Sequence, residues 1–378
     1  MNSHTVDTPS ERSAMRSALP IDLGAILAGS PDRRTTAEDA VLRVRVISQG
    51  GVPRWVVPED TRRAVAVLKT WKPYKLKSRL KWSAIVALCR VNALRSLPGV
   101  GNESLNCDLS YWREHLPGYS NAWAVVAYVG SVSPTRKAIL FFVDEKSNVR
   151  AVAKTPIIEA AKASILNEAN ILKKLEGRLA LPRVLFSDER EGIAAQTWME
   201  GVNVSRSFGA EQLQLLTCLA LDEVRVRMAK QREELEKRSA STNADLSLLG
   251  RALALLDSEE ELRACVEHGD FAPWNLRRLG DGRLTVLDWE WAREEGYPWQ
   301  DVCRYFYMQD YLFQERCNVW KKLMAHAVLA EYRQRFELSD EAVRGLTAMY
   351  LLRRLCDDYD DGLPDRVEYA AEKLREIF

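Results

Sequence analysis

The sequence contains only four histidines, and its seven cysteines include no C-x-x-C pair. Structural zinc sites need clustered cysteine and histidine ligands, so we do not expect a zinc-binding domain. An odd and dispersed set of cysteines is also unlike a disulfide framework and fits free thiols in a reducing cytoplasm. We therefore expect a cytoplasmic protein with buried free cysteines.

Long hydrophobic runs are absent as well, since no apolar stretch approaches the roughly 20 residues that a helix needs to cross a bilayer. The apolar stretch Leu19–Leu27 is broken by Asp22, so we expect neither a secretory signal nor a transmembrane segment. The formal net charge is only +1, and no nucleic-acid partner is therefore expected. A chain of 378 residues is long enough for two or three domains.

The most informative segment is Glu267–Glu290, which reads EHGDFAPWNLRRLGDGRLTVLDWE. Asp270 and Asn275 stand in a D-x-x-x-x-N spacing, and Asp288 ends an apolar run. The Gly-Asp-Gly sequence between two apolar runs predicts a hairpin, which would return Asp288 to the side of Asn275. Phosphoryl transfer needs this set, because one carboxylate takes the acceptor proton while an amide oxygen and a second carboxylate hold Mg²⁺. An isolated H-x-D triplet is usually a turn with a solvated aspartate, but the extended pattern favours the functional interpretation.

The segment resembles the catalytic and metal loops of protein-kinase-like phosphotransferases, and most closely those of the aminoglycoside phosphotransferase and choline kinase branch. Gly269 follows His268 where protein kinases usually have arginine, and Asp288 precedes Trp-Glu instead of Phe-Gly. Both departures resemble small-molecule kinases. The resemblance covers roughly residues 120–378. It implies an α+β, bilobal fold, with a mainly antiparallel sheet in the N-lobe and a helical C-lobe.

The same resemblance implies the cofactors and the roles of the site residues. ATP is the expected nucleotide, with GTP not excluded, and Mg²⁺ is the expected metal. Asp270 would accept or orient the acceptor proton, and Asn275 and Asp288 would bind Mg²⁺. His268 belongs to the catalytic loop, where support through hydrogen bonds is favoured over a general-base role. Asp301 would brace this loop, and it could also, or instead, cap the helix that follows it.

A kinase of this class also needs a cation on the nucleotide phosphates and a carboxylate that holds the cation. Lys154 ends a predicted strand that resembles the family's V-A-I-K strand, and Glu168 lies on a predicted helix over residues 160–175. The alternatives are a strand-end lysine that reaches water and an exposed glutamate paired with Lys173 or Lys174.

Two further segments resemble nucleotide-binding elements. The loop that begins at Gly130 resembles the loop that covers ATP phosphates, where Ser131 and Ser133 would donate hydrogen bonds. It has one glycine only, and its alternative is an ordinary polar hairpin loop. A predicted strand over residues 194–199 contains Trp198 and leads into Glu200, a position that resembles the hinge whose backbone meets the adenine.

We expect four regions along the chain: a disordered tail (1–38), an α/β accessory module (39–118), a kinase-like N-lobe (119–200) and a helical C-lobe (201–378). The accessory module should contain strands at 41–47 and 53–57, helices at 61–70 and 79–97, and a break at 98–102. Residues 206–255 should form two helices, the first over Glu223–Arg238. The acidic cluster Cys356–Gly362 is either a site for a cationic or polyhydroxylated acceptor or a solvated helix end.

Basic and aromatic residues alternate in the segment 69–82. This segment can contact an anionic surface such as phospholipid headgroups. The favoured alternative is a solvated basic face whose aromatic side chains pack on the protein.

The sequence therefore predicts ATP- and Mg²⁺-dependent phosphorylation of a hydroxyl on a small-molecule acceptor, such as a sugar, aminoglycoside or amino alcohol. The alternative is a catalytically silent kinase-like protein that binds nucleotide or a partner. A protein kinase is disfavoured, because the short segment from Glu290 to Asp301 leaves no room for an activation loop.

Overall fold

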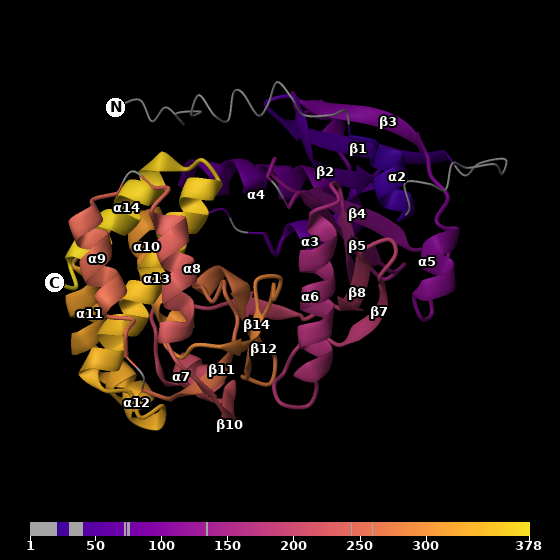
Figure 1. The fold of residues 1–378 in the computed structure, drawn as a ribbon. Helices are drawn as coiled ribbons and strands as arrows, with labels where there is room; N and C mark the ends of the chain where they lie inside the picture. Colours follow the sequence, from indigo (N-terminus) through magenta and orange to yellow (C-terminus); the bar gives the residue numbers. More distant parts are fainter. Residues whose placement is uncertain are drawn as a thin grey trace. The chain divides into compact units, whose positions relative to one another are not determined.

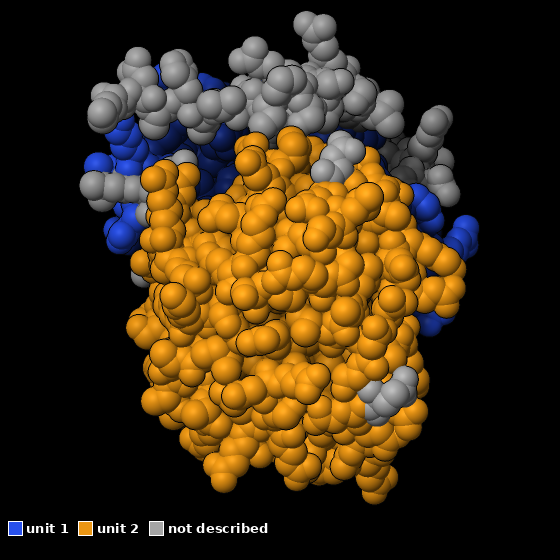
Figure 2. Space-filling view, turned by 60° about the vertical axis from the view of Figure 1, so that its left-hand side comes forward, with its two compact units in different colours: residues 1–174, 182–199 blue, residues 175–181, 200–378 orange. Residues whose placement is uncertain are grey.

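The computed structural model describes residues 21–29, 41–71, 73, 76–133, 135–242, 244–258 and 260–378. The chain divides into two compact units (Figure 2). Unit 1 comprises residues 1–174 and 182–199, and unit 2 comprises residues 175–181 and 200–378. None of the described helices is long and apolar enough to cross a membrane.

Unit 1 is built on an eight-stranded antiparallel sheet with the strand order β3-β1-β2-β4-β5-β6-β8-β7 (Figure 1). The strands are β1 (Val41–Gln49), β2 (Val52–Pro58), β3 (Val100–Asn106), β4 (Ala124–Val129), β5 (Lys137–Val143), β6 (Val149–Pro156), β7 (Val184–Asp188) and β8 (Ile193–Thr197). Its helices are α2 (Leu23–Ala28), η1 (Thr61–Ala64), α3 (Val65–Leu68), α4 (Leu76–Arg90), η2 (Leu94–Ser96), α5 (Ser110–His115) and α6 (Ala161–Lys174). The predicted α+β class with an antiparallel sheet is confirmed.

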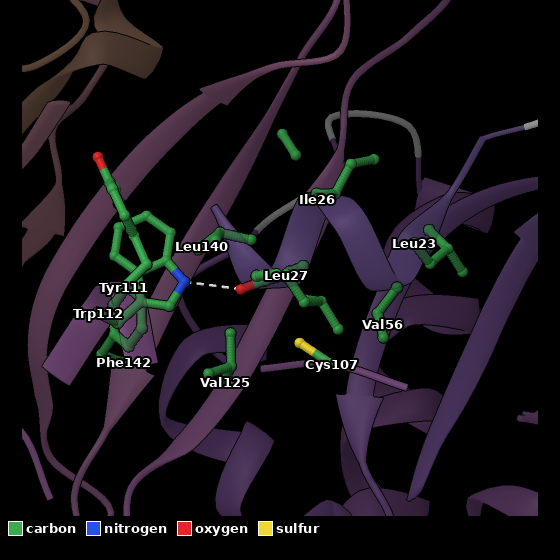
Figure 3. Packing of buried hydrophobic residues seen from close by; sticks show 14 of the residues in the cluster. Leu23, Ile26, Leu27, Val56, Cys107, Tyr111, Trp112, Val125, Leu140 and Phe142 are labelled. Carbon is green, nitrogen blue, oxygen red and sulfur yellow. Dashed lines mark hydrogen bonds between the residues drawn. The ribbon is translucent and has the colours of Figure 1, made fainter. Parts of the chain in front are cut away.

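Successive side chains of a strand point to opposite sides of a sheet. In the central strands of this sheet both sides are buried, each in a core of its own. Val125 of β4 packs in a core with α2 and α5, whereas Val126 packs in a second core with α3 and α4. In the first core, the Trp112 indole N–H donates to the Leu27 carbonyl at 2.7 Å (Figure 3). Helices that precede residue 119 therefore pack on both faces of the sheet.

The strands of the predicted accessory module belong to the same sheet as those of the predicted N-lobe. β2 pairs with β4, and Trp55 stands opposite Tyr128. The boundary at residue 118 stays a prediction. The expected break at 98–102 is wrong in part, because Val100 begins β3, which pairs with β1. Most β3 side chains are exposed, so the strand carries no apolar alternation that the sequence could reveal.

In the basic-aromatic segment, two described tryptophans pack on unit 1. Trp71 and Trp82 lie with their ring centroids 5.7 and 5.5 Å from Trp55. The Trp82 indole also donates to the Leu68 carbonyl at 2.9 Å. These contacts agree with the favoured alternative, in which the aromatic side chains of the segment pack on the protein. Contact of the segment with an anionic surface stays a prediction. Three members of the segment lie outside the described residues, namely Lys72, Tyr74 and Lys75.

Unit 2 is mainly helical, as expected, and holds two three-stranded sheets. Its helices are α7 (Ala210–Thr217), α8 (Ala229–Ser239), α9 (Leu246–Ala254), η3 (Pro273–Asn275), α10 (Gln300–Phe313), α11 (Val319–Ala325), α12 (Ala327–Arg335), α13 (Asp340–Asp360) and α14 (Pro364–Arg375). Its strands are β9 (Gly201–Asn203), β10 (Ala220–Val226), β11 (Leu262–Glu267), β12 (Leu276–Leu279), β13 (Leu284–Val286) and β14 (Arg293–Gly296).

The predicted helix Glu223–Arg238 is wrong over its first residues. β10 occupies Ala220–Val226 and pairs with β11, and α8 begins only at Ala229. The charged residues of β10 are largely exposed. Exposed charged residues occur in both helices and strands, so the sequence of this segment does not indicate a strand before its partner β11 is known.

The acidic cluster at the end of α13 is paired with arginines of unit 2. Arg238 lies 2.9 Å from Asp357 and 2.8 Å from Asp360. The buried Asp358 lies 2.5 Å from Arg354. These pairs offset much of the negative charge, and a role in acceptor binding stays a prediction.

Candidate functional site

The loop that carries His268 and Asp270 is held at its base by Asp301 of α10. The two oxygens of this carboxylate accept the backbone N–H groups of His268 at 2.7 Å and Gly269 at 2.9 Å. Gly269 has a φ of +79°, and a Cβ here would lie 2.4 Å from the Trp291 carbonyl oxygen, so glycine is required. The bracing role expected for Asp301 is present. The alternative helix-cap role is wrong, because Trp299 occupies the N-cap position.

Burial raises the pKa of Asp301 to about 8, and the nearby carboxylate of Glu267 adds to the rise. The two backbone N–H groups oppose this shift because they stabilise the charged form. The loop is therefore anchored by a carboxyl group that titrates near neutral pH.

Asp301 should make folding stability depend on pH. Its pKa in the folded chain lies above its ordinary value of 3.8. Between these two values the folded state keeps a proton that the unfolded state releases, so the contribution of Asp301 to stability falls as pH rises. We expect the difference in Tm between the native protein and Asp301→Asn to shrink from pH 5 to pH 8. Melting curves of both proteins at pH 5 and pH 8 measure this difference. A Tm difference that is the same at both pH values would contradict the prediction.

His268 is fully buried and both of its ring nitrogens have partners. Nδ1 accepts the backbone N–H of Asp270 at 3.1 Å, which places the ring proton on Nε2, 3.1 Å from the Leu287 carbonyl. The ring also packs against Trp289 with a centroid distance of 4.6 Å. This geometry is that of a side chain that supports the loop and joins it to the strand before Asp288.

The carboxylate of Asp270 is held from two sides. The Asn275 amide Nδ2 donates to Asp270 Oδ2 and to its backbone carbonyl, both at 2.9 Å. Arg304 of α10 donates to Oδ1 through Nε at 2.9 Å and Nη2 at 2.7 Å. Arg304 was missed in the sequence. Its only signal is its place three residues after Asp301, on the same face of a predicted helix.

The predicted hairpin brings Asp288 next to Asn275. β12 and β13 pair with Leu276 opposite Val286, and the Leu287 N–H donates to the Asn275 carbonyl at 2.8 Å. Asp288 follows directly in a left-handed conformation, with a φ of +71°.

The two residues fit a divalent cation. Because the Asn275 NH₂ group is committed to Asp270, the amide oxygen remains available as a ligand. Amide and carboxylate oxygens are the ligands that Mg²⁺ prefers.

A second constellation lies in unit 1. Lys154 of β6 and Glu168 of α6 form an ion pair between Lys154 Nζ and Glu168 Oε2, and the side chains are only 9% and 3% exposed. The alternatives of a solvated lysine and an exposed glutamate are therefore wrong. Two ions are buried together here, and each needs the other, since an isolated buried charge is costly.

Glu168→Gln should destabilise unit 1 by about 3–5 kcal/mol, because it removes the carboxylate charge that offsets the buried charge of Lys154. The pair of the exposed Glu159 with the half-buried Lys162, at 3.1 Å, offers a control in the same unit. Glu159→Gln should cost less than about 1 kcal/mol. Urea denaturation of both variants measures the difference, and equal free energies of unfolding would contradict the prediction.

The loop that begins at Gly130 is fixed by two arginines. Arg136 Nε donates to the Gly130 carbonyl at 3.0 Å, and Arg54 Nη1 donates to Ser131 Oγ at 3.0 Å. The Ser133 carbonyl accepts the Arg136 N–H at 3.2 Å. A Cβ at Gly130 would lie 2.7 Å from a carbonyl oxygen of β5, so the single glycine is required for close strand approach. Binding of phosphate by this loop stays a prediction.

Trp198 follows β8 and packs edge-on against Phe141 with a centroid distance of 5.9 Å, and Glu200 is exposed.

The structure thus groups the predicted site residues within each unit. Unit 2 brings together His268, Asp270, Asn275 and Asp288. Unit 1 holds Lys154, Glu168, the Gly130 loop and Trp198.

The chain contains a match to the model of the phosphotransferase enzyme family over residues 139–338. This match covers more than half of the sequence and includes all residues of the catalytic and metal loops. The chain belongs to this family and is a phosphotransferase.

Solved structures of phosphotransferases are similar to the chain at low identity. The macrolide 2'-phosphotransferase MphH from Brachybacterium faecium is 17% identical, with a TM-score of 0.49 over 70% of this chain and 97% of its own. A choline kinase from Cryptosporidium parvum Iowa II is 13% identical, with a TM-score of 0.46 over 71% of this chain and 92% of its own. A search of curated proteins returns no match.

Proposed function

We propose that the protein transfers the γ-phosphoryl group of ATP, in the presence of Mg²⁺, to a hydroxyl of a small metabolite. The observation that carries this proposal is the arrangement around Asp270, whose carboxylate is oriented by Asn275 while Asn275 itself is joined by a backbone hydrogen bond to the residue before Asp288. This arrangement supports a role for the Asp270 carboxylate at the acceptor proton, beside two oxygen ligands for a cation.

Asn275 and Asp288 would hold Mg²⁺ through the amide oxygen and the carboxylate. The bound ion would offset negative charge on the nucleotide phosphates. The left-handed backbone of Asp288 is a conformation that aspartate tolerates better than most residues, which fits a position chosen for its carboxylate.

Asp270 would accept the proton of the acceptor hydroxyl. Its backbone N–H is bonded to His268, and its carboxylate is bonded to Asn275 and Arg304, so its position is fixed before the acceptor binds. The fixed position of the Asp270 carboxylate should increase the reaction rate, because the base needs no rearrangement before it accepts the proton.

Lys154 would bind the α- and β-phosphates, and Glu168 would hold its ammonium group in place. The backbone around Trp198 and Glu200 would meet the adenine. Main-chain contacts leave no side-chain signature that separates ATP from GTP, so adding unlabelled GTP as a competitor to the assay below would report the nucleotide preference.

The test uses the pure protein, γ-labelled ATP, Mg²⁺ and a fractionated metabolite extract. We expect label to move from ATP into one fraction, and this transfer should require the divalent ion. The matched control is Asp270→Asn, which should not label that fraction. Equal labelling by both proteins, or no labelling of any fraction, would contradict the proposed function.

A further inference from the structure

The helix α10 presents two polar side chains, Asp301 and Arg304, to the catalytic loop from one face. Asp301 binds the loop backbone, and Arg304, one turn later, binds the carboxylate of Asp270. The ion pair is largely removed from water, since the side chains of Arg304 and Asp270 are 14% and 19% exposed. A single rigid element therefore fixes both the backbone and the reactive group of the loop.

The guanidinium of Arg304 engages only one oxygen of the carboxylate. Nε and Nη2 both donate to Oδ1, while Oδ2 accepts a hydrogen bond from Asn275. Because Arg304 holds Oδ1 and Asn275 holds Oδ2, the two residues together fix the rotation of the carboxylate as well as its position. Oδ2 is thereby turned to the side of Asn275, which we assign to the metal.

Arg304 also stays protonated, and therefore positively charged, in this partly buried position. Burial alone would lower the pKa of this guanidinium, but the charge of Asp270 and the polar contact with Tyr350 raise it above its ordinary value. The loop therefore presents a carboxylate whose negative charge is offset by a permanent neighbouring cation.

We propose that Arg304 is a positioning residue that orients Asp270 and restricts the acceptor to compounds without a positive charge beside the reacting hydroxyl, such as neutral or acidic sugars. The inference rests on the proposed function and deepens it. A bare carboxylate would attract an ammonium group next to the hydroxyl. Here such a group would approach a guanidinium that is bonded to the same carboxylate, in a partly buried site where like charges repel strongly.

The first test separates positioning from folding. Arg304→Gln should lower kcat by about 100-fold, because a misplaced reactive group costs this much. The KM for ATP should change by less than about threefold, since Arg304 is assigned to the acceptor side. Arg304→Lys should recover at least about tenfold of the loss, because it restores the charge and one donor. Arg335→Gln, which removes an exposed arginine paired with Glu331 at 2.8 Å, is the control and should behave like the native protein.

The second test measures the net charge of the acceptor compound. The compound labelled in the metabolite assay is treated with phosphatase, and its net charge at pH 7 is measured by ion exchange. We expect a neutral or anionic compound. We also expect Arg304→Gln to raise kcat/KM for an amine-bearing analogue, relative to the neutral compound, by about tenfold.

The outcomes are distinguishable. A cationic acceptor, or equal kcat in the native protein and Arg304→Gln, would overturn the inference and leave the proposed function in place. A loss of kcat in Arg304→Gln that Arg304→Lys does not recover would overturn the positioning role. Absence of any labelled compound, with no difference between the native protein and Asp270→Asn, would overturn the proposed function and this inference together.

Discussion

Asp270→Asn should lower kcat by about 10²–10⁴-fold, the range that a positioned general base contributes. Asparagine has nearly the shape of aspartate but cannot accept a proton. The variant also places an amide beside Arg304, where one of its two polar groups no longer matches the donors at 2.7 and 2.9 Å. Initial rates of ADP formation with the identified acceptor measure the effect.

Nucleotide binding should survive in Asp270→Asn, because Lys154 and the proposed metal ligands are unchanged. Titration with a fluorescent ATP analogue tests this point. A variant that binds nucleotide normally and turns over at the native rate would remove Asp270 from the reaction.

The second large effect is expected for Asp288→Ala, which should reduce Mg²⁺-dependent turnover by at least about 10³-fold. The proposed metal would lose its carboxylate ligand, and with it the charge that stabilises the transferring phosphoryl group. Alanine also tolerates the φ of +71° poorly, at a cost of about 1–2 kcal/mol.

Asp288→Asn separates these two causes. Asparagine accepts the left-handed backbone but lacks the charge, so turnover should fall by a similar factor while the melting temperature stays near that of the native protein. Steady-state kinetics and thermal melting of both variants provide the comparison. Turnover near the native rate in Asp288→Asn would refute the metal-ligand assignment.

The site could be predicted from the sequence where the chain positions residues locally. The spacing of Asp270 and Asn275, and the Gly280–Gly282 turn that returns the chain to Asp288, lie within one short segment. A hairpin of this kind is fixed by its own turn and strands. The pair of Lys154 with Glu168 was inferred only from order along the chain and the resemblance, and the structure shows the two groups in contact.

What the sequence did not reveal depends on contacts between distant segments. Arg304 lies 34 residues from Asp270, and nothing in the spacing shows that α10 returns to the loop. The strands β3 and β10 carry mostly exposed side chains, so their apolar pattern is weak until their partners are in place. Likewise, the sequence allowed Asp301 to brace the loop, to cap the following helix, or to do both. The hydrogen bonds to His268 and Gly269 show the brace, and Trp299 at the N-cap position excludes the cap.

The most direct test of the central claim is a crystal structure with a non-hydrolysable ATP analogue and Mn²⁺, located by its anomalous scattering. The account predicts an ion within coordination distance, about 2.0–2.2 Å, of both the Asn275 amide oxygen and an Asp288 carboxylate oxygen, on the terminal phosphate of the analogue. An ion bound elsewhere on the nucleotide, with Asn275 and Asp288 both outside its coordination shell, would contradict it.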